Sequence, residues 1–546
     1  MKASSWLVLW SLWAARFVQQ PTMPVRTHGG WLRGLMAPDG SYKQYLAIPY
    51  ATIPENRFQA PDKAPTWRGV FDAVEEYIRC TQRFSEEGMV LGQEDCLVLN
   101  IYTPAESTPS SKYPVMVFIH GGAFFEGSAT TFLYSGGYLV KKKVIFVTFN
   151  YRFNIQGHLC LGIKEAAGNA GMKDQVAALK WIQRNIKAFG GDPDNVTLFG
   201  VSSGAASVSY HMLSPMSEGL FHKVIIESAS SLAPWAFQFR PVYTASLLTK
   251  AMGYTTEDPY EIYNILLEKT DEELVRTRVP RQIGNTKVSE PLYSPCVEKK
   301  IVGEEAFLTD LPFNLLSKGK YSKVPMIIGR NIEEGLFLAG MENVTSINNM
   351  RVEKSLPKDL AIPNEDVRNE IVKKLERYYM DGKNISYETI GNLSRLLGEI
   401  FFVYPVLEET ELHLENNDSP VYTYVFNYDG WRNMAKFSLL SWVLCSFPGA
   451  THADEMFYLF SQPMLPSMFE SKMIDRMTTM WTNFAKYGDP TPESTALLPV
   501  KWTAANKSSP ESLVIDAEFS TAPLYPRESL KYLREIYSKY RRKEDC

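Results

Sequence analysis

From Tyr113 onward, short apolar runs alternate with longer amphipathic stretches, and few folds accept that order. The apolar runs read V-M-V-F-I, V-I-F-V-T-F and V-T-L-F-G, and the helical stretch A-A-L-K-W-I-Q-R-N-I separates the second run from the third. Strands that alternate with helices favour a mostly parallel sheet covered by helices on both faces. The sequence therefore predicts an α/β protein.

The same pattern continues beyond the first 230 residues. Further strand candidates are K-V-I-I-E from Lys223, V-P-M-I-I-G from Val324 and V-Y-T-Y-V-F from Val421. Residues 243–278 and 363–401 lie between them and have helical spacing with many charges. No linker rich in Gly, Ser or Pro separates these insertions from the rest. We therefore expect residues 19–546 to form a single α/β domain with a large mixed sheet.

The charge balance excludes several classes of partner. The chain has 57 Lys and Arg against 61 Asp and Glu, a net charge of −4 over 546 residues. This balance offers no basic face for phosphates, so we expect no nucleic-acid partner. The cysteines form no C-x-x-C pair of the kind that holds zinc, and we expect neither a metal nor a cofactor.

The first eighteen residues have the pattern of a secretory signal peptide. Lys2 precedes an apolar stretch from Trp6 to Ala15, which ends in small residues. The alternative is a short membrane anchor, but the stretch is too short for the ~30 Å hydrocarbon layer and Arg16 interrupts it. No later segment has the ~18 to 20 apolar residues of a spanning helix, and the chain end is not a KDEL-type signal. We expect a secreted protein without stable membrane insertion.

The cysteines are too sparse for a disulfide framework. Two of the six, Cys80 and Cys96, are close in sequence, and in a secreted chain they could close a short loop worth ~3 kcal/mol. The others are expected to be single small residues within apolar segments or at the tail: Cys160, Cys296, Cys445 and Cys546.

Six Asn-x-Ser/Thr sequons would allow glycosylation in a secreted chain. They begin at Asn195, Asn343, Asn384, Asn392, Asn417 and Asn506. Because Asn195 directly precedes a buried-looking strand, we expect that site to stay unmodified.

A candidate nucleophile lies in F-G-V-S-S-G-A-A-S, where Gly200, Ser202 and Gly204 form G-x-S-x-G. Alone, this motif is more often a plain turn than a catalytic site. Here it follows the strand V-T-L-F and precedes a helix-compatible segment, as a nucleophile elbow requires. Small residues are needed on both sides because the turn is strained and the backbone passes close to its neighbours. Ser203 lacks that symmetric pair, so Ser202 is the predicted nucleophile.

A second element directly follows the strand V-M-V-F-I, which runs into H-G-G-A-F at His120. Acyl transfer creates a negative oxygen, and each backbone N–H aimed at that oxygen is worth ~3 to 4 kcal/mol. We assign the donors of this oxyanion hole to Gly122, Ala123 and Ser203. The alternative is a glycine-rich strand end, but two motifs in the expected order and context argue for the oxyanion loop.

Elimination selects the general base. In the order serine, acid, histidine, the base follows Ser202, and four histidines do. His211 lies nine residues along the following helix, ~13 Å away in rise, and cannot reach back. His222 opens a strand, and His413 stands in a charged run expected to be a solvated helix face. His452 remains, in the loop segment G-A-T-H-A-D-E.

The base needs a carboxylate that holds its tautomer and stabilises the imidazolium. A strand that ends in acid is the expected source, and V-P-M-I-I-G-R-N-I-E-E-G supplies both Glu333 and Glu334. Spacing alone does not separate the two.

Many motifs of the chain resemble those of the type-B carboxylesterase and cholinesterase family, from about Val25 to Tyr540. They are G-x-L-R-G at Gly30, I-P-Y-A at Ile48, R-F-x-A-P at Arg57, E-D-C-L-x-L-N-I-Y at Glu94, H-G-G-A-F at His120, N-Y-R at Asn150, G-N-A-G-M-K-D-Q at Gly168, F-G-G-D-P at Phe189 and F-A-K-Y-G-D-P at Phe484. The resemblance implies an α/β-hydrolase fold and ester hydrolysis through an acyl-enzyme.

The resemblance also implies roles for particular residues. The acid of the family stands in an E-G step, which matches Glu334, and its histidine in G-x-x-H, which matches His452. The family further implies a disulfide and two structural ion pairs: Cys80 with Cys96, Arg57 with Glu94 and Arg152 with Asp174.

Departures from the family pattern bear on the substrate. Val201 stands where the family usually has glutamate, and the chain lacks the tryptophan that cholinesterases stack on quaternary ammonium groups. Acetylcholine is therefore a poor candidate. Juvenile hormone esterases typically carry glutamine at the Val201 position, so that specificity stays open. Ser203 replaces the usual alanine and keeps the backbone N–H.

The overall pattern is most similar to insect carboxylesterases that degrade neutral, lipophilic esters such as odorants, hormones or xenobiotics. Phe124, Phe125 and Trp235 would suit an apolar pocket, and each could equally be a core residue. A binding protein is the alternative, because adhesion proteins of this family keep the fold without the triad. An amide or lipid hydrolase would share the same chemistry. The sequence leaves the oligomeric state open.

Overall fold

A computed structural model describes residues 20–83, 88–287, 293–439, 442–463 and 465–544, and the expected signal peptide at residues 1–18 lies outside them. Its central feature is an eleven-stranded sheet among the described residues. In spatial order the strands are β18 (Ser520–Pro523), β17 (Glu511–Ile515), β16 (Val421–Phe426), β15 (Met326–Asn331), β14 (Lys223–Glu227), β13 (Gly191–Val201), β11 (Tyr113–Ile119), β12 (Ile145–Phe149), β10 (Val98–Pro104), β4 (Tyr42–Pro49) and β3 (Leu35–Met36).

The middle of the sheet is parallel and its edges are antiparallel. Strands β12, β11, β13, β14, β15, β16 and β17 pair in parallel, whereas β10, β4 and β3 at one edge and β18 at the other run antiparallel. Every strand that the sequence predicts from Tyr113 onward is present. The predicted fold class, a mostly parallel mixed sheet between helices, is confirmed.

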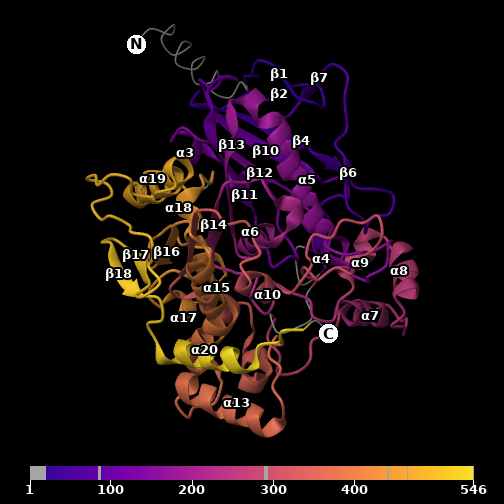
Figure 1. The fold of residues 1–546 in the computed structure, drawn as a ribbon, viewed down its shortest axis with the longest axis vertical. Coiled ribbons are helices and arrows are strands. Elements are labelled where there is room, and N and C mark those ends of the chain that lie inside the picture. Colours follow the sequence, from indigo (N-terminus) through magenta and orange to yellow (C-terminus); the bar gives the residue numbers. More distant parts are fainter. Residues whose placement is uncertain (1–19, 84–87, 288–292, 440–441, 464, 545–546) are drawn as a thin grey trace, which may run out of the picture.

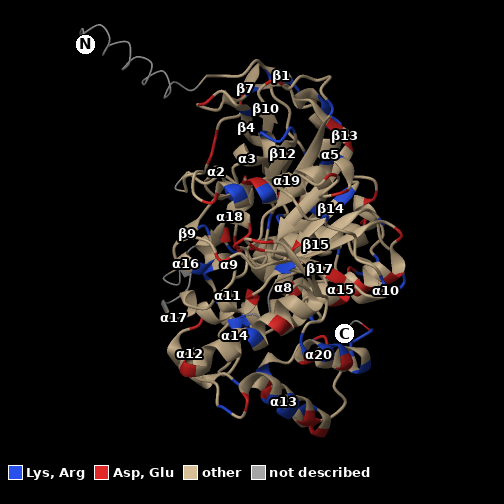
Figure 2. Ribbon diagram, turned by 90° about the vertical axis from the view of Figure 1, so that its left-hand side faces the viewer, with Lys and Arg blue, Asp and Glu red and all other residues tan. Residues whose placement is uncertain are grey.

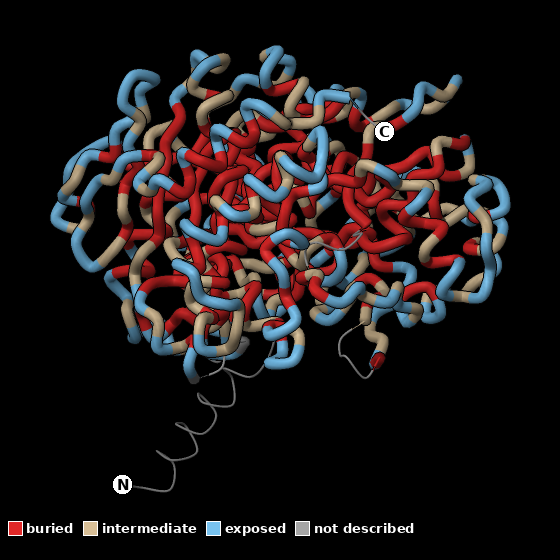
Figure 3. Tube along the Cα trace, turned by 90° about the horizontal axis from the view of Figure 1, so that it is seen from below, coloured by how far each residue is buried: buried red, intermediate tan, exposed pale blue. Residues whose placement is uncertain are grey.

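Alternate side chains of the central strands enter two different core clusters, because successive residues of a strand point to opposite faces. In β11, Val115 and Val117 belong to one cluster, while Met116 and Phe118 belong to the other. Helices α5 (Ala170–Asn185) and α6 (Ser203–Leu213) cover the first face, and α18 (Met456–Leu459) and α19 (Ser471–Tyr487) cover the second (Figure 1). Figure 3 shows the resulting continuous buried interior.

The predicted helical insertions are also present. The first insertion forms α7 (Pro241–Ala251), which begins two residues before the expected start at 243, α8 (Pro259–Leu267) and α9 (Asp271–Arg276). The second forms α13 (Glu365–Met380) and α14 (Ile390–Gly398), followed by a π-helical turn (Glu399–Val403) and α15 (Tyr404–Asn416). The helical run Tyr387–Asn416 is the one described segment long and apolar enough to cross a membrane by composition. However, 83% of its most apolar window is buried inside the protein, as in the core helix of a soluble fold.

The remaining strands are short. The small strands are β1 (Val25–Arg26), β2 (Trp31–Arg33), β5 (Ala51–Thr52), β6 (Asp62–Lys63), β7 (Val70–Asp72), β8 (Gln82–Arg83) and β9 (Val90–Leu91). The other α-helices are α2 (Thr131–Tyr134), α3 (Gly137–Val140), α4 (Asn154–His158), α10 (Pro312–Ser317), α11 (Glu334–Gly340), α12 (Val344–Asn349), α16 (Met434–Leu439), α17 (Trp442–Cys445) and α20 (Glu528–Tyr540). Acidic and basic residues are interspersed over these elements (Figure 2).

Two disulfides are present, where the sequence led us to expect one. Cys80 and Cys96 are bridged as the family resemblance implies, with 4.9 Å between their Cα atoms. Cys160 and Cys296 form a second bridge, which corrects the expectation that they are isolated small residues. These two cysteines are 136 residues apart, and spacing cannot reveal a pairing that only the tertiary fold creates.

One of the two implied ion pairs is confirmed and the other is wrong. Arg152 binds Asp174 through two hydrogen bonds, Nε to Oδ2 at 2.8 Å and Nη2 to Oδ1 at 2.6 Å, in the buried interior. Arg57 instead pairs with Asp271 at 2.8 Å, not with Glu94. Asp271 begins helix α9 in an insertion, so its position depends on how that insertion packs.

Candidate active site

Ser202 lies in a sharp turn between strand β13 and helix α6. Its backbone has φ 58° and ψ −128°, a strained combination that is rare for a residue with a side chain. A Cβ added at Gly204 would lie 2.0 Å from the backbone oxygen of Ile119, and one at Gly200 would lie 2.7 Å from the backbone of Gly204. The glycines on both sides of Ser202 are therefore required by close approach of the backbone, as the motif predicts.

The turn presents one of its two serines to solvent. Ser202 is partly exposed, whereas the side chain of Ser203 is completely buried. The Ser202 N–H donates to the backbone oxygen of Glu227 at the end of β14, at 2.9 Å, which anchors the turn to the next strand. Val201 is buried in the second core cluster, so the residue before the serine is part of the apolar core.

The H-G-G-A-F loop packs directly against this turn. A Cβ added at Gly121 would lie 3.0 Å from the Cβ of Ser202. Gly122 and Ala123 both have positive φ, at 124° and 55°. Within the described part of the chain, no protein oxygen accepts a hydrogen bond from the N–H of Gly122, Ala123 or Ser203. These N–H groups are available to a ligand oxygen, which is what an oxyanion hole requires.

His120 holds the loop in shape. Its Nδ1 lies 2.8 Å from the carbonyl oxygen of Gly121, and because a carbonyl only accepts, Nδ1 carries the proton. The ring stacks on Tyr151 at 4.5 Å, and the Tyr151 hydroxyl donates to the backbone oxygen of His120. Burial lowers the pKa of His120 to about 4, so this histidine is neutral at pH 7. Its contribution is to hold the conformation of the loop.

Glu334 and His452 are brought together from distant parts of the chain. The distance between Glu334 Oε2 and His452 Nδ1 is 2.6 Å, and both side chains are buried. The other carboxylate oxygen accepts the N–H of Asn331 at 2.7 Å. Donation from Nδ1 to the carboxylate leaves Nε2 of His452 as the basic nitrogen. Spacing alone did not separate the two adjacent glutamates, and the contact with His452 is made by Glu334.

Ser202 and His452 do not share a direct side-chain hydrogen bond in the structure. Such bonds are often long or poorly aligned before substrate binds. Among the described residues, no group of three or more His, Cys, Asp and Glu side chains is arranged to hold a metal ion.

The other three histidines after Ser202 have hydrogen-bond partners away from Glu334. His211 contacts Gln175 and Ser217, and His222 accepts the N–H of Val196 at 3.1 Å. His413 is completely buried on α15, with Nε2 3.3 Å from Glu409 Oε1, which corrects the expectation of a solvated helix face. The charged run around His413 suggested a solvated face, but α15 packs between the sheet and α20. Even polar residues of this helix are therefore buried.

Sequence reasoning missed a cluster of buried acids behind Glu334. Glu455 accepts from Asn331 Nδ2 at 2.5 Å and from the Ser228 hydroxyl at 3.3 Å. Burial, reinforced by the charge of Glu334, raises the pKa of Glu455 to about 7. Burial also raises the pKa of Glu227, which accepts from Trp481. The only sequence signal was the position of Glu455 three residues after His452.

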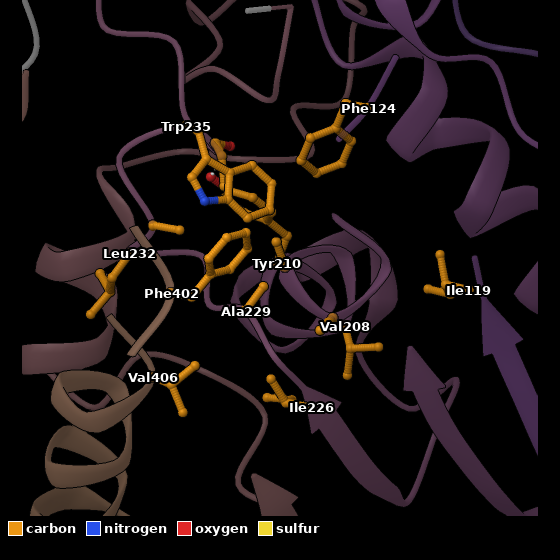
Figure 4. Packing of buried hydrophobic residues seen from close by; sticks show 14 of the residues in the cluster. Ile119, Phe124, Val208, Tyr210, Ile226, Ala229, Leu232, Trp235, Phe402 and Val406 are labelled. Atoms are coloured by element: carbon orange, nitrogen blue, oxygen red, sulfur yellow. Dashed lines mark hydrogen bonds between the residues drawn. The ribbon is translucent and has the colours of Figure 1, made fainter. Parts of the chain in front are cut away.

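A row of aromatic rings connects the oxyanion loop to His452. Phe124 lies 6.4 Å from Trp235, Trp235 lies 5.7 Å from Phe402, and Phe402 lies 4.3 Å from the His452 ring, measured between ring centres. Figure 4 shows Phe124, Trp235 and Phe402 converging above helix α6. Phe124 and Trp235 are thus buried residues that also border the site, while Phe125 is exposed. The sequence analysis did not predict that Phe402 lies at this site.

Comparison with known proteins identifies the family of this chain. A sequence model described as "Carboxylesterase family" matches residues 21–532. Esterase E4 of Myzus persicae is 34% identical over 481 residues, which cover 85% of each chain. A juvenile hormone esterase of Tribolium castaneum is 32% identical over 505 residues, which cover 87% of this chain and 84% of that protein.

A solved structure is also similar. The crystal structure of juvenile hormone esterase from Manduca sexta, with OTFP covalently attached, has a TM-score of 0.82 and 30% identity and covers 95% of this chain and 99% of that chain. The relatives are named for ester hydrolysis, so the alternative of a non-catalytic adhesion protein receives no support. With its α/β-hydrolase fold, the chain is a carboxylic ester hydrolase that belongs to the carboxylesterase family.

Proposed function

We propose that Ser202, His452 and Glu334 form the catalytic triad. Nε2 of His452 takes the Ser202 proton while Oγ attacks the ester carbonyl carbon. The resulting tetrahedral oxyanion accepts hydrogen bonds from the N–H groups of Gly122, Ala123 and Ser203. Collapse breaks the bond to the leaving alkoxide, which His452 protonates. Water then attacks the acyl-enzyme with the same proton transfers, and the acid is released.

The contact between Glu334 and His452 is the main support for this proposal. These residues are 118 positions apart, yet a hydrogen bond of 2.6 Å fixes the imidazole tautomer. The strained conformation of Ser202 and the open N–H groups of the adjacent loop supply the other two parts of an acyl-transfer site.

We further propose that the substrate is a neutral, lipophilic ester, such as an odorant, hormone or xenobiotic. The aromatic row from Phe124 to Phe402 supplies apolar contact, and the buried Val201 removes a carboxylate that would attract cations. Two relatives are named juvenile hormone esterases, which supports an ester of this class.

We also infer that the protein is secreted and folds as a single domain. Two disulfides are favoured by an oxidising compartment and agree with the signal-like residues 1–18. A single sheet contains strands from Leu35 to Pro523, so its two edges come from opposite ends of the chain.

Hydrolysis of matched esters tests the function. Neutral naphthyl and nitrophenyl esters should be turned over, and a thiocholine ester of the same acyl group should be a markedly poorer substrate. The Ser202→Ala variant is the control and should fold but hydrolyse neither. Equal turnover of the cationic ester would contradict the substrate class, and turnover by Ser202→Ala would contradict the triad.

A further inference from the structure

The six Asn-x-Ser/Thr sequons of the chain have no part in the proposed triad, and all of them lie within the described residues. An N-linked glycan is bulky and hydrophilic, so a folded protein accepts one only where the sequon reaches solvent. The glycan is attached at the side-chain nitrogen Nδ2, and that nitrogen must be free of hydrogen bonds to the protein. These two criteria separate the six sequons into two groups.

The sequon at Asn343 opens helix α12. Asn343, Val344 and Thr345 are all exposed. Oδ1 of Asn343 accepts the N–H of Ser346 at 2.8 Å and so caps the helix, while Nδ2 makes no hydrogen bond to any described residue. A glycan on Nδ2 therefore leaves the helix cap intact.

The sequon at Asn384 lies in the loop that follows α13, which Figure 1 shows at one end of the molecule. Asn384 is exposed, as are the three residues before it, and its side chain makes no hydrogen bond within the described part of the chain. Its backbone oxygen accepts from the Thr389 hydroxyl at 2.8 Å, which holds the loop while the side chain stays free.

The sequon at Asn506 lies between α19 and β17, and its three residues are exposed. Oδ1 of Asn506 accepts from the Ser508 hydroxyl at 2.9 Å and from the Ser509 N–H at 2.7 Å. The local turn thus uses only the oxygen of the amide and leaves Nδ2 available, as at Asn343.

Two of the other sequons are blocked by the fold around them. Asn195 lies within strand β13, and the two residues after it are completely buried. Asn417 is half-buried and uses both ends of its amide. Its Nδ2 donates to the backbone oxygen of Val324 at 3.2 Å, and its Oδ1 accepts the N–H of Ser419 at 3.0 Å.

The sequon at Asn392 is blocked by a helix. Asn392 lies in α14, and its Nδ2 donates to the backbone oxygen of Tyr379 at the end of α13. The sequon hydroxyl, on Ser394, is buried. A glycan on Nδ2 would have to lie where the amide already contacts the neighbouring helix.

We propose that the folded protein carries N-linked glycans on Asn343, Asn384 and Asn506 and on none of the other three sequons. This inference rests on the proposed secretion, because the co-reactant, a lipid-pyrophosphate-linked oligosaccharide, belongs to the secretory pathway. In the transfer, Nδ2 bonds to the anomeric carbon of the first sugar and loses one proton, and the lipid pyrophosphate leaves with the bonding electron pair.

Site mapping of the secreted protein tests the proposal. The full chain is expressed in mammalian cells in two forms, with its own residues 1–18 and with a heterologous signal peptide in their place. Protein from the medium is deglycosylated by PNGase F in oxygen-18 water, which converts each glycosylated Asn to labelled Asp, and peptides are then mapped by mass. Label is expected on Asn343, Asn384 and Asn506.

Sequon variants give the matched controls. Thr345→Ala should remove the glycan from Asn343 without touching the helix cap, whereas Thr345→Ser keeps the hydroxyl and should keep the glycan. Asn384→Gln should raise gel mobility by one glycan, and Asn392→Gln should leave it unchanged.

Label on any of the three blocked sequons, or no label on any one of the three exposed sequons, would overturn the proposal. Secretion that fails only with the native residues 1–18 concerns the proposed secretion instead. In that case the map of the chain with the heterologous signal peptide still decides which sequons carry glycans.

Discussion

Two hydrogen bonds hold the carboxylate of Glu334 in place. One carboxylate oxygen faces His452 Nδ1 at 2.6 Å and the other accepts the Asn331 N–H at 2.7 Å, so both oxygens act only as acceptors. Glu333 directly precedes Glu334 as the N-cap of helix α11, makes no such contact and is the natural comparison. At the scale of the residue, the proposed chemistry depends on which of two adjacent glutamates the backbone turns towards the histidine.

We predict that Glu334→Gln lowers kcat about ten-thousand-fold, because the amide can present an N–H to Nδ1 and favour the wrong tautomer. Steady-state hydrolysis of a naphthyl ester measures this effect. Glu333→Gln is the matched control and should retain nearly full activity. Comparable losses in the two variants would contradict the assignment of Glu334.

Glu455 gives a prediction about pH and stability. Its folded pKa of about 7 lies above the ordinary value of 4.5, so the folded protein binds this proton more tightly than the unfolded chain does. Stability from this group is present below pH 4.5 and is lost as pH rises through 7, by about 3 kcal/mol at most. Glu455→Gln should therefore gain thermal stability relative to the parent between pH 5 and pH 8. Parallel melting curves that keep a constant difference would contradict this account.

At the scale of the element, the elbow depends on the contact between α6 and the end of β11. The Cα of Gly204 faces the backbone oxygen of Ile119 so closely that no side chain fits. The strain at Ser202 is maintained because the N–H of Ser202 bonds to β14 and α6 begins immediately afterwards. The position of the proposed nucleophile thus depends on packing between elements as much as on the serine itself.

Gly204→Ala should abolish ester hydrolysis and lower the melting temperature, because its Cβ would lie 2.0 Å from a backbone atom that cannot rotate away. Activity and thermal melts measure both effects. Gly382→Ala is the control, since that glycine faces open space and the cost of its positive φ is only about 1 kcal/mol. An active, stable Gly204→Ala protein would show that the close approach is not needed.

Sequence reasoning succeeded for elements whose signals are local. The strands from Tyr113 to Phe426, the turn at Ser202 and the loop at His120 follow from apolar periodicity and from glycines at fixed positions. It failed where the partner is set by tertiary packing. Asp271 reaches Arg57 from an insertion, and the burial of His413 depends on what covers α15.

At the scale of the whole molecule, two disulfides constrain very different lengths of chain. The bridge between Cys80 and Cys96 spans 16 residues, and the one between Cys160 and Cys296 spans 136 and includes the segment with Ser202. The longer bridge therefore joins the segment just after α4 to the connection between β14 and β15. Loop-closure entropy makes the longer bridge the more stabilising of the two.

Replacing both Cys160 and Cys296 by alanine should reduce stability by about 5 kcal/mol, against about 3 kcal/mol for Cys80 and Cys96. Urea denaturation of the two double variants under identical oxidising conditions gives the comparison. A larger loss from the shorter loop would contradict the entropic account.

Peptide mapping after organophosphate treatment tests the central claim, that Ser202 is the activated nucleophile of the site. We predict one phosphoryl adduct, located on Ser202 in the parent protein, retained in Ser203→Ala and absent from Ser202→Ala. An adduct on Ser203, or a folded parent protein that takes up no phosphoryl group, would contradict the proposed triad.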